Sequence, residues 1–260
     1  MPVDYFFAKT SKNMNIKQYL DSTYLKTAKQ AGISEDDNLE IVKKAIQEAI
    51  DEKFKLVMIR PKMVAVAQNL INESQSKVLV GTVIDFPKGK STIEKKLSQA
   101  KKAILDGADD LDFVCNYKAF KKGEIALVKH EILVCTKLGL DHNKTVKWII
   151  EVAALNNHQI IQLCVLIKNV VLSSFKEDFY ASVFVKSSTG FYETKNNGPN
   201  GATIPTIMMM VENAAPLSIK AAGGVRSYDE AIEMIKLGVT RIGTSGAKMI
   251  ADHVILKSEY

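Results

Sequence analysis

The sequence contains no uninterrupted apolar stretch long enough to cross a membrane. A membrane-spanning helix needs about 20 consecutive apolar residues. The longest apolar run covers residues 160–172, and Gln162, Lys168 and Asn169 interrupt it. The N-terminus also lacks the basic region followed by an apolar core that marks a secretory signal peptide. We therefore expect a cytoplasmic protein that makes no contact with membranes.

The chain has only three cysteines and four histidines, and neither set shows the spacing of a metal site. Cys115, Cys135 and Cys164 form no even framework of disulfide partners. Reduced cysteines in the core are typical of a cytosolic protein. Because no His-x-x-x-His pattern occurs, a zinc site is not expected. The sequence thus predicts a protein that works without a metal or another cofactor.

The formal net charge of +6 is not gathered into one patch. Pairs of lysines are spread over amphipathic segments, at residues 43–44, 95–96, 101–102 and 121–122. A nucleic-acid-binding protein concentrates its basic residues and interleaves them with aromatic side chains. The observed spread predicts solvated helix faces and no nucleic-acid partner, with a mild attraction for small anions.

From about residue 39 onward, the apolar residues alternate between helical and strand-like spacing. The pattern predicts strands around Lys186, around Lys220 and at residues 19–23, 54–60, 78–86, 110–116, 146–152 and 240–246. It predicts helices near residues 39–50, 63–73, 93–104, 124–138, 158–172, 208–211 and 227–238, and a last one after residue 246. Strands and helices therefore alternate regularly along the chain.

Eight strand–helix repeats in 260 residues predict one (β/α)₈ barrel, or TIM barrel, of the α/β class. The strands read as near-continuous apolar runs, as in a parallel sheet covered on both faces. An open doubly wound sheet is the alternative, but it usually carries Gly-x-Gly-x-x-Gly at its first turn, which this chain lacks. We expect residues 1–260 to form a single domain with a short N-terminal extension and a C-terminal tail.

Two lysines lie in segments that otherwise read as buried strands. Lys186 follows Val183-Phe-Val, and Lys220 follows Leu217-Ser-Ile. Lysine is almost never fully buried without a partner or a task. A single such lysine is usually a strand end whose stem is buried while its ammonium group reaches water. Two of them, each followed by a glycine-bearing loop, favour a Schiff-base site in which one ammonium keeps the other amine neutral.

Side-chain alternation predicts which strand residues face the barrel axis. Phe184, Lys186 and Ser188 point inward while Val183 and Val185 face the helices, and on the next strand Lys220 points inward while Ile219 faces outward. On the fourth strand, Leu111 and Phe113 face outward and turn Asp112 inward. An inward carboxylate among apolar neighbours needs compensating cations, which the two lysines would provide.

Glycine-bearing stretches follow the last two predicted strands, at Gly223-Gly224 and at Gly243-Thr-Ser-Gly246. In this fold, the loops after strands seven and eight commonly hold a phosphate. Glycine lets the backbone approach the anion, and Ser245 adds a hydroxyl donor. Thr189-Gly190, just after Lys186, would contribute from the other side.

Seven segments, in order from about residue 16 to residue 250, carry a family resemblance. They are Leu20-Asp-Ser-Thr-Tyr-Leu25, Val80-Gly-Thr-Val-Ile-Asp-Phe-Pro-Lys-Gly89, Gly107-Ala-Asp-Asp-Leu-Asp-Phe-Val-Cys-Asn116, Trp148-Ile-Ile-Glu151, Phe184-Val-Lys-Ser-Ser-Thr-Gly-Phe191, Ile219-Lys-Ala-Ala-Gly-Gly-Val-Arg226 and Arg241-Ile-Gly-Thr-Ser245. With these motifs the chain resembles the deoxyribose-phosphate aldolases, a family of class I aldolases on a (β/α)₈ barrel.

The resemblance implies roles for the motif residues. Lys186 matches the Schiff-base lysine, Lys220 the lysine that lowers the pKa of that nucleophile, and Asp112 the acid of the proton relay. Asp21 and Thr23 match further polar residues of the pocket.

Two other positions vary within the family. At Phe191, some members carry a lysine thought to contact the phosphate, and others carry phenylalanine. In some members a terminal tyrosine is thought to reach the active site, and this chain ends in Tyr260.

The resemblance implies reversible cleavage of 2-deoxy-D-ribose 5-phosphate to D-glyceraldehyde 3-phosphate and acetaldehyde, in deoxyribonucleoside catabolism. Another phosphosugar enzyme on the same barrel, such as an isomerase or a transaldolase, would share the phosphate loops without needing this lysine pair. A non-catalytic phosphosugar-binding barrel would bind the sugar without forming an imine. The partner in each case is a small phosphosugar. The sequence does not fix the oligomeric state, for which a homodimer is the expectation.

Overall fold

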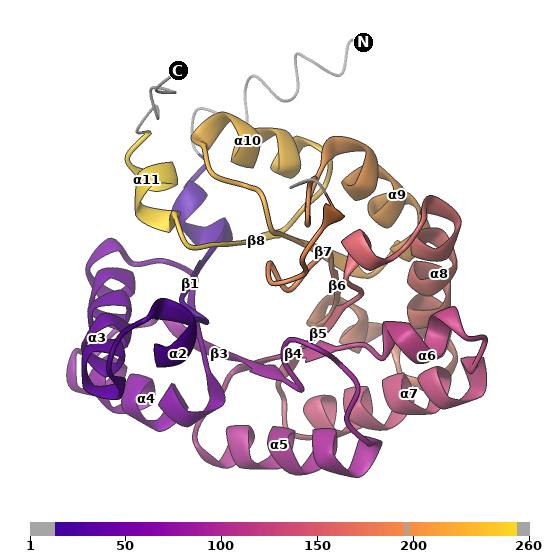
Figure 1. Cartoon of the computed structure of the whole chain (residues 1–260), viewed down its shortest axis with the longest axis horizontal. Coiled ribbons are helices and arrows are strands. Elements are labelled where there is room, and N and C mark those ends of the chain that lie inside the picture. The colour runs from indigo at the N-terminus through magenta and orange to yellow at the C-terminus, as the bar shows by residue number, and fades with distance from the viewer. Residues whose placement is uncertain (1–13, 196–197, 254–260) are drawn as a thin grey trace.

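Parallel strands form a closed barrel at the centre of the computed structural model, which describes residues 14–195 and 198–253 (Figure 1). The strands are β1 (Leu20–Thr23), β2 (Leu56–Ile59), β3 (Leu79–Ile84), β4 (Asp110–Val114), β5 (Thr145–Ile149), β6 (Val183–Lys186), β7 (Ser218–Ala222) and β8 (Arg241–Thr244). They pair in sequence order, and β8 pairs with β1 to close the barrel. This arrangement confirms the predicted (β/α)₈ barrel.

Helices follow the strands and surround the barrel (Figure 1). The α-helices are α2 (Ala28–Ala31), α3 (Glu35–Glu52), α4 (Val64–Glu73), α5 (Ile93–Leu105), α6 (Tyr117–Lys121), α7 (Ile125–Asp141), α8 (Asn157–Ser174), α9 (Ile204–Ala214), α10 (Tyr228–Lys236) and α11 (Ala247–Ala251). Short 3₁₀ helices are η1 (Ile16–Tyr19), η2 (Pro61–Met63), η3 (Val152–Ala154) and η4 (Glu177–Ser182). Among the described helices, none has both the length and the apolar character needed to span a membrane.

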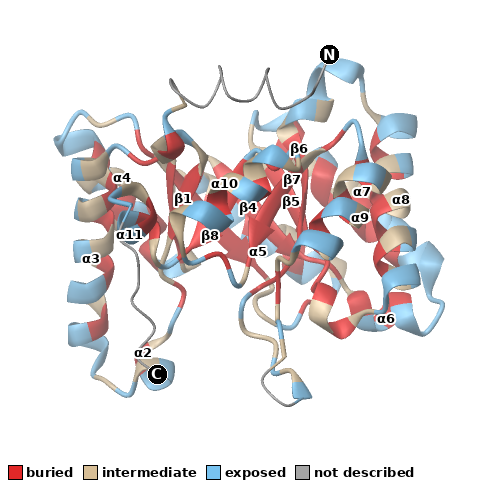
Figure 2. Cartoon of the chain, turned by 90° about the horizontal axis from the view of Figure 1, so that it is seen from above, coloured by how far each residue is buried: buried red, intermediate tan, exposed pale blue. Residues whose placement is uncertain are grey.

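The main hydrophobic core lies between the barrel and the helices. Figure 2 shows buried strands at the centre and exposed outer faces on the helices. Val183 and Val185 of β6 and Ile219 of β7 lie in this core, as strand alternation predicts. Leu111 and Phe113 of β4 join the same core. Asp112, which lies between them in the chain, therefore faces the barrel axis.

Five strands end earlier than the sequence pattern predicts. The strands expected at residues 54–60, 78–86, 110–116, 146–152 and 240–246 end at Ile59, Ile84, Val114, Ile149 and Thr244. Asp85 and Glu151 each adopt a left-handed backbone with φ of 55°. That conformation turns the chain out of the sheet. The apolar pattern alone does not reveal such a turn, because apolar residues such as Phe86 and Ile150 continue the pattern past the end of the strand.

The inside of the barrel is divided into an apolar part and a charged part. Leu56 and Met58 of β2 and Val83 of β3 form a separate buried apolar cluster with Leu25. The buried charged side chains come from β1 and from β4 to β8. The charged part contains the lysines that the sequence singles out.

Candidate active site

Lys186 and Lys220 lie side by side on neighbouring strands and share one carboxylate oxygen. They are paired in the register of β6 with β7. The Nζ atom of Lys186 lies 2.8 Å from Oδ2 of Asp112, and the Nζ atom of Lys220 lies 2.9 Å from the same oxygen. All three side chains are almost completely buried. The structure therefore brings together the three residues to which the sequence assigns chemistry.

The ionic cluster extends beyond these three residues. Lys147 of β5 pairs with Oδ1 of Asp112 at 3.0 Å and with Asp110 at 2.5 Å. Arg241 of β8 pairs with Asp110 at 3.1 Å and with Asp21 at 2.6 Å.

The sequence interpretation assigned no role to Lys147, Asp110 or Arg241. The signal for Lys147 was the same as for Lys186, since it is a lysine between the outward-facing residues Val146 and Trp148.

Cations outnumber carboxylates in this cluster. It contains four basic side chains, Lys147, Lys186, Lys220 and Arg241, and three acidic ones, Asp21, Asp110 and Asp112. If all were ionised, the cluster would carry an excess of one positive charge in a buried site. Releasing one proton from the least stabilised cation removes that excess.

Lys186 is the cation whose pKa falls. Burial, together with the positive charges of Lys220 and Lys147, lowers the pKa of Lys186 to about 8, although Asp112 opposes the shift. An ordinary lysine has a pKa near 10.4. A measurable fraction of Lys186 is therefore a neutral, nucleophilic amine near neutral pH.

The neighbours of Lys186 stay ionised. Burial acts to raise the pKa of Asp112, but Lys147, Lys186 and Lys220 outweigh it and hold that pKa well below the usual value. Burial acts to lower the pKa of Lys220, but Asp112 and Asp21 outweigh it, so the pKa of Lys220 is raised. The site thus places an amine that loses its proton readily beside an ionised carboxylate and a cation.

Asp21 and Thr23, the polar residues predicted on the first strand, lie at different depths. Asp21 is fully buried, and its Oδ2 atom lies 2.6 Å from Nζ of Lys220. Thr23 is partly exposed, and its hydroxyl donates to the backbone oxygen of Asp21 at 2.9 Å. Tyr260 lies outside the described residues.

The loop after Lys186 is held by the carboxylate of Glu151. Both oxygens of Glu151 accept hydrogen bonds, from the hydroxyl of Ser188 at 2.8 Å and from the hydroxyl and backbone N–H of Thr189. The same hydroxyls accept from the backbone N–H groups of Gly190 and Phe191 at 2.9 and 3.0 Å. The N–H groups of this predicted phosphate loop are therefore occupied within the protein.

The loop after β7 has free donors instead. Gly223 and Gly224 adopt left-handed φ angles of 79° and 104°. Their backbone N–H groups donate to no other described residue. Together with Asn200 and Arg226 they line a cavity of about 480 Å³. Free N–H groups beside an arginine form a suitable site for an anion.

The two predicted residues of the last strand and its loop have different environments. Gly243 lies within β8, where an added Cβ atom would come within 3.1 Å of Cε of Lys220. The absence of a side chain there makes room for the stem of that lysine. Ser245 follows the strand and is exposed.

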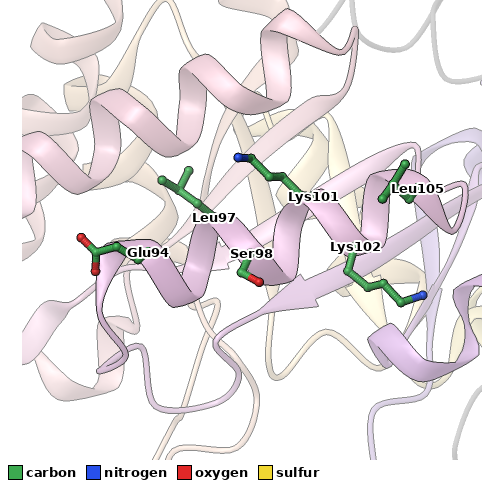
Figure 3. A pocket seen from close by; sticks show the side chains of 6 residues that line it. All are labelled: Glu94, Leu97, Ser98, Lys101, Lys102 and Leu105. Carbon is green, nitrogen blue, oxygen red and sulfur yellow. The ribbon is translucent and has the colours of Figure 1, made fainter.

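A cavity of about 520 Å³ elsewhere has no connection with this chemistry. It lies along one helix, α5, on the outside of the barrel (Figure 3). Its lining residues are Glu94, Leu97, Ser98, Lys101, Lys102 and Leu105. None of these side chains belongs to the lysine cluster.

Comparisons with known proteins give one consistent family. A profile described as DeoC/LacD family aldolase matches residues 18–250. The deoxyribose-phosphate aldolase of Thermococcus gammatolerans is 36% identical over 240 residues, which cover 92% of this chain and 96% of that protein. The deoxyribose-phosphate aldolase of Streptococcus pneumoniae strain Hungary19A-6 is 33% identical over 248 residues, which cover 95% of this chain and 100% of that protein.

The fold is also similar to that of a solved structure. The deoxyribose phosphate aldolase of Aeropyrum pernix, described as having a unique tetrameric structure, superimposes with a TM-score of 0.74 at 24% identity. The match covers 97% of both chains, and at this identity it shows the fold alone. The family profile and the curated relatives span nearly all of the described barrel. The chain belongs to the DeoC/LacD aldolase family.

Proposed function

We propose that this protein is a deoxyribose-phosphate aldolase, a lyase that reversibly cleaves 2-deoxy-D-ribose 5-phosphate to D-glyceraldehyde 3-phosphate and acetaldehyde. The observation that carries the proposal is the contact of Lys186 and Lys220 with one oxygen of Asp112. The lowered pKa of Lys186, about 8, agrees with a Schiff-base nucleophile. Curated relatives of nearly full length carry the name of this enzyme.

In the first step, the neutral amine of Lys186 attacks the C1 aldehyde of the open-chain sugar. The carbinolamine that forms loses its oxygen as water, which leaves an iminium ion on Lys186. Lys220 stays protonated and disfavours a second positive charge beside it. This neighbour keeps the free amine available at the start of each cycle.

In the second step, the iminium ion accepts the electrons of the C2–C3 bond. A base removes the proton of the C3 hydroxyl, the bond breaks, and glyceraldehyde 3-phosphate leaves while an enamine remains. Asp112 is ionised and lies 2.8 Å from the nitrogen of Lys186, so it is suited to relay this proton through water. Protonation of the enamine at C2 and hydrolysis then release acetaldehyde and regenerate Lys186.

The remaining predicted residues complete the proposed pocket. Gly223 and Gly224 offer free N–H groups to the phosphate, and Ser245 is an exposed hydroxyl beyond the next strand. Asp21 and Thr23 form the polar wall on β1. Thr189 shapes the pocket through its bonds to Glu151, and Gly190 through its bond to Ser188. Gly243 gives Lys220 its space.

Borohydride trapping tests the proposal directly. Purified protein is incubated with acetaldehyde and sodium borohydride, and aldolase activity and intact mass are followed together. We expect progressive inactivation with a mass gain of one ethyl group per chain, because the imine is reduced in place. An active isomerase or a non-catalytic phosphosugar-binding protein gains no such group. Cleavage of deoxyribose 5-phosphate without a trappable adduct would refute the Schiff-base mechanism.

The proposal also covers the setting of the enzyme. We infer one catalytic domain over the whole chain, acting in the cytoplasm on deoxyribose phosphate from nucleoside breakdown. Cys115, Cys135 and Cys164 are all free and buried, which agrees with a reducing compartment. We also expect a homodimer, and sedimentation equilibrium would measure the mass of the assembly in solution.

A further inference from the structure

Arg60 lies at the same end of the barrel as the reacting lysines. It directly follows Ile59, the last residue of β2, and the carboxyl ends of parallel strands meet at one edge. Its Nε–H donates to the backbone oxygen of Leu25 at 2.7 Å, and an Nη–H donates to Gln30 at 3.3 Å. The side chain is half-buried, and burial lowers the pKa of Arg60. Its guanidinium is therefore fixed in place at the mouth of the barrel.

Two aromatic rings lie close to this guanidinium. The central carbon of Arg60 lies 4.8 Å from the ring centre of Phe86 and 6.0 Å from that of Phe191. The two rings meet edge to face, with their centres 5.1 Å apart. Phe191 comes only five positions after Lys186. Lys186 ends β6, which lies on the opposite side of the barrel from β2. Arg60 thus lies across the mouth and against the loop of the proposed nucleophile.

Arg60 has no anionic partner among the described residues. Arg241, by contrast, pairs with both Asp21 and Asp110 inside the barrel. The sequence has only three arginines, Arg60, Arg226 and Arg241, although lysine is abundant on its helices. A half-buried guanidinium that lies against two rings and lacks a carboxylate keeps N–H groups available for an anion.

We propose that Arg60 is a specificity-determining residue whose guanidinium binds the phosphate of the sugar substrate from the β2 side of the barrel mouth. This inference rests on the proposed function and goes beyond it, because the phosphate loops lie after β7 and β8. A guanidinium presents paired N–H groups that match two phosphate oxygens. Its hydrogen bonds to Leu25 and Gln30 and its contacts with Phe86 and Phe191 hold it in place, so little conformational freedom is lost on binding.

The test compares two substrates that differ only in the phosphate. The specificity constant kcat/KM is measured for 2-deoxyribose 5-phosphate and for 2-deoxyribose with wild type, Arg60→Gln and Arg60→Lys. We expect Arg60→Gln to lower the value for the phosphate ester by about tenfold or more, since charge-assisted hydrogen bonds are the strong ones. The value for deoxyribose stays within about twofold, and Arg60→Lys retains part of the preference.

Lys62→Gln is the matched control. Lys62 lies two residues further along the chain, in η2, is exposed and pairs with Glu35 at 2.5 Å. The Lys62→Gln variant loses the same charge from the same end of the barrel. Its preference for the phosphate ester over deoxyribose should stay that of wild type. Thermal unfolding of each variant confirms that equal amounts of folded protein are compared.

Two results would overturn the inference. If Arg60→Gln lowers both specificity constants equally, Arg60 only supports the packing of Phe86 and Phe191. If neither constant changes, Arg60 makes no contact with the substrate. If the wild type lacks aldolase activity, the proposed function fails. The role of Arg60 is then tested separately, by measuring the affinity of each variant for inorganic phosphate with calorimetry. Weaker phosphate binding by Arg60→Gln than by Lys62→Gln then supports the anion contact, and equal binding rejects it.

Discussion

The protein contains two kinds of buried lysine site, one inside the barrel and one outside it. Inside, Lys186 shares Asp112 with Lys220 and Lys147. Outside, Lys96 of α5 is completely buried and forms an ion pair with Glu131 of α7. Burial is equally deep in both places, so depth alone does not distinguish a nucleophile from a structural cation.

The balance of charge differs between the two sites. Lys96 faces two carboxylates, Glu131 and Asp85, the second at 3.6 Å. Its Nζ atom also donates to the backbone oxygens of Val114 at 2.7 Å and Gly89 at 3.2 Å. In the barrel, cations outnumber carboxylates. An excess of cation in a buried cluster favours release of a proton from one of its members.

The outer site also has a clear structural task. Glu131 accepts a hydrogen bond from the backbone N–H of Asn116 at 3.0 Å, and Lys96 bonds Val114 at the end of β4. Lys96 bonds Gly89, which lies in the loop after β3. The pair thus ties together two loops at the barrel mouth. The comparison predicts that the inner lysines control the reaction and that the outer pair controls stability.

The largest expected effect comes from Lys186. Lys186→Leu should abolish detectable aldolase activity and borohydride trapping, because it removes the amine that forms the imine. In wild type, peptide mass mapping after trapping should find the ethyl group on Lys186. A label on Lys220, Lys147 or Lys96 would reverse the assignment of roles.

Asp112→Asn should have the next largest effect. It removes the proton acceptor while keeping the size of the side chain, so the imine with acetaldehyde should still form. Carbon–carbon cleavage should fall by about 10²–10⁴-fold, the usual contribution of a general acid–base group. Turnover is measured per folded molecule, alongside thermal unfolding. A folded variant with near-normal turnover would remove Asp112 from the proton relay.

Lys220→Leu tests whether the excess positive charge of the cluster lowers the pKa of Lys186. Removing this positive neighbour should raise the pKa of Lys186 above about 8, so that less neutral amine is present at pH 7. If that pKa rises by one to two units, the rate at neutral pH falls by roughly 10- to 100-fold.

The pH dependence separates this effect from a loss of folding. The rate of wild type should rise with pH through the Lys186 pKa of about 8, where the reactive amine loses its proton. In Lys220→Leu that rise should move to higher pH. A slower variant with an unchanged pH profile would contradict the charge argument.

The smallest effect on turnover is expected at the outer site. Lys96→Met leaves Glu131 buried without its cation, and breaking a buried ion pair in this way costs about 3–5 kcal/mol of stability. Turnover per folded molecule and the pH profile should stay close to wild type. Urea unfolding measures the loss, and Lys96→Met with Glu131→Gln should recover part of it. A shifted pH profile in Lys96→Met would show that the two sites are coupled.

Much of the fold could be predicted from the sequence, since the spacing of apolar residues reflects local periodicity. The eight strands, the helices between them and the inward direction of Lys186, Lys220 and Asp112 all follow from alternation. The ends of β3 and β5 do not, because left-handed turns at Asp85 and Glu151 leave the apolar pattern unbroken.

The residues that complete the ionic cluster depend on the closed barrel. Asp21 and Arg241 are 220 positions apart in the chain, yet β1 and β8 are neighbours and their side chains are in contact. Lys147 gave a sequence signal like that of Lys186, and only its two carboxylate partners show that it belongs to the same charge balance. The sequence by itself determined that Lys186 and Lys220 lie in buried strands. The tertiary structure decided how many carboxylates pair with each lysine. That number depends on contacts between strands that are distant in sequence.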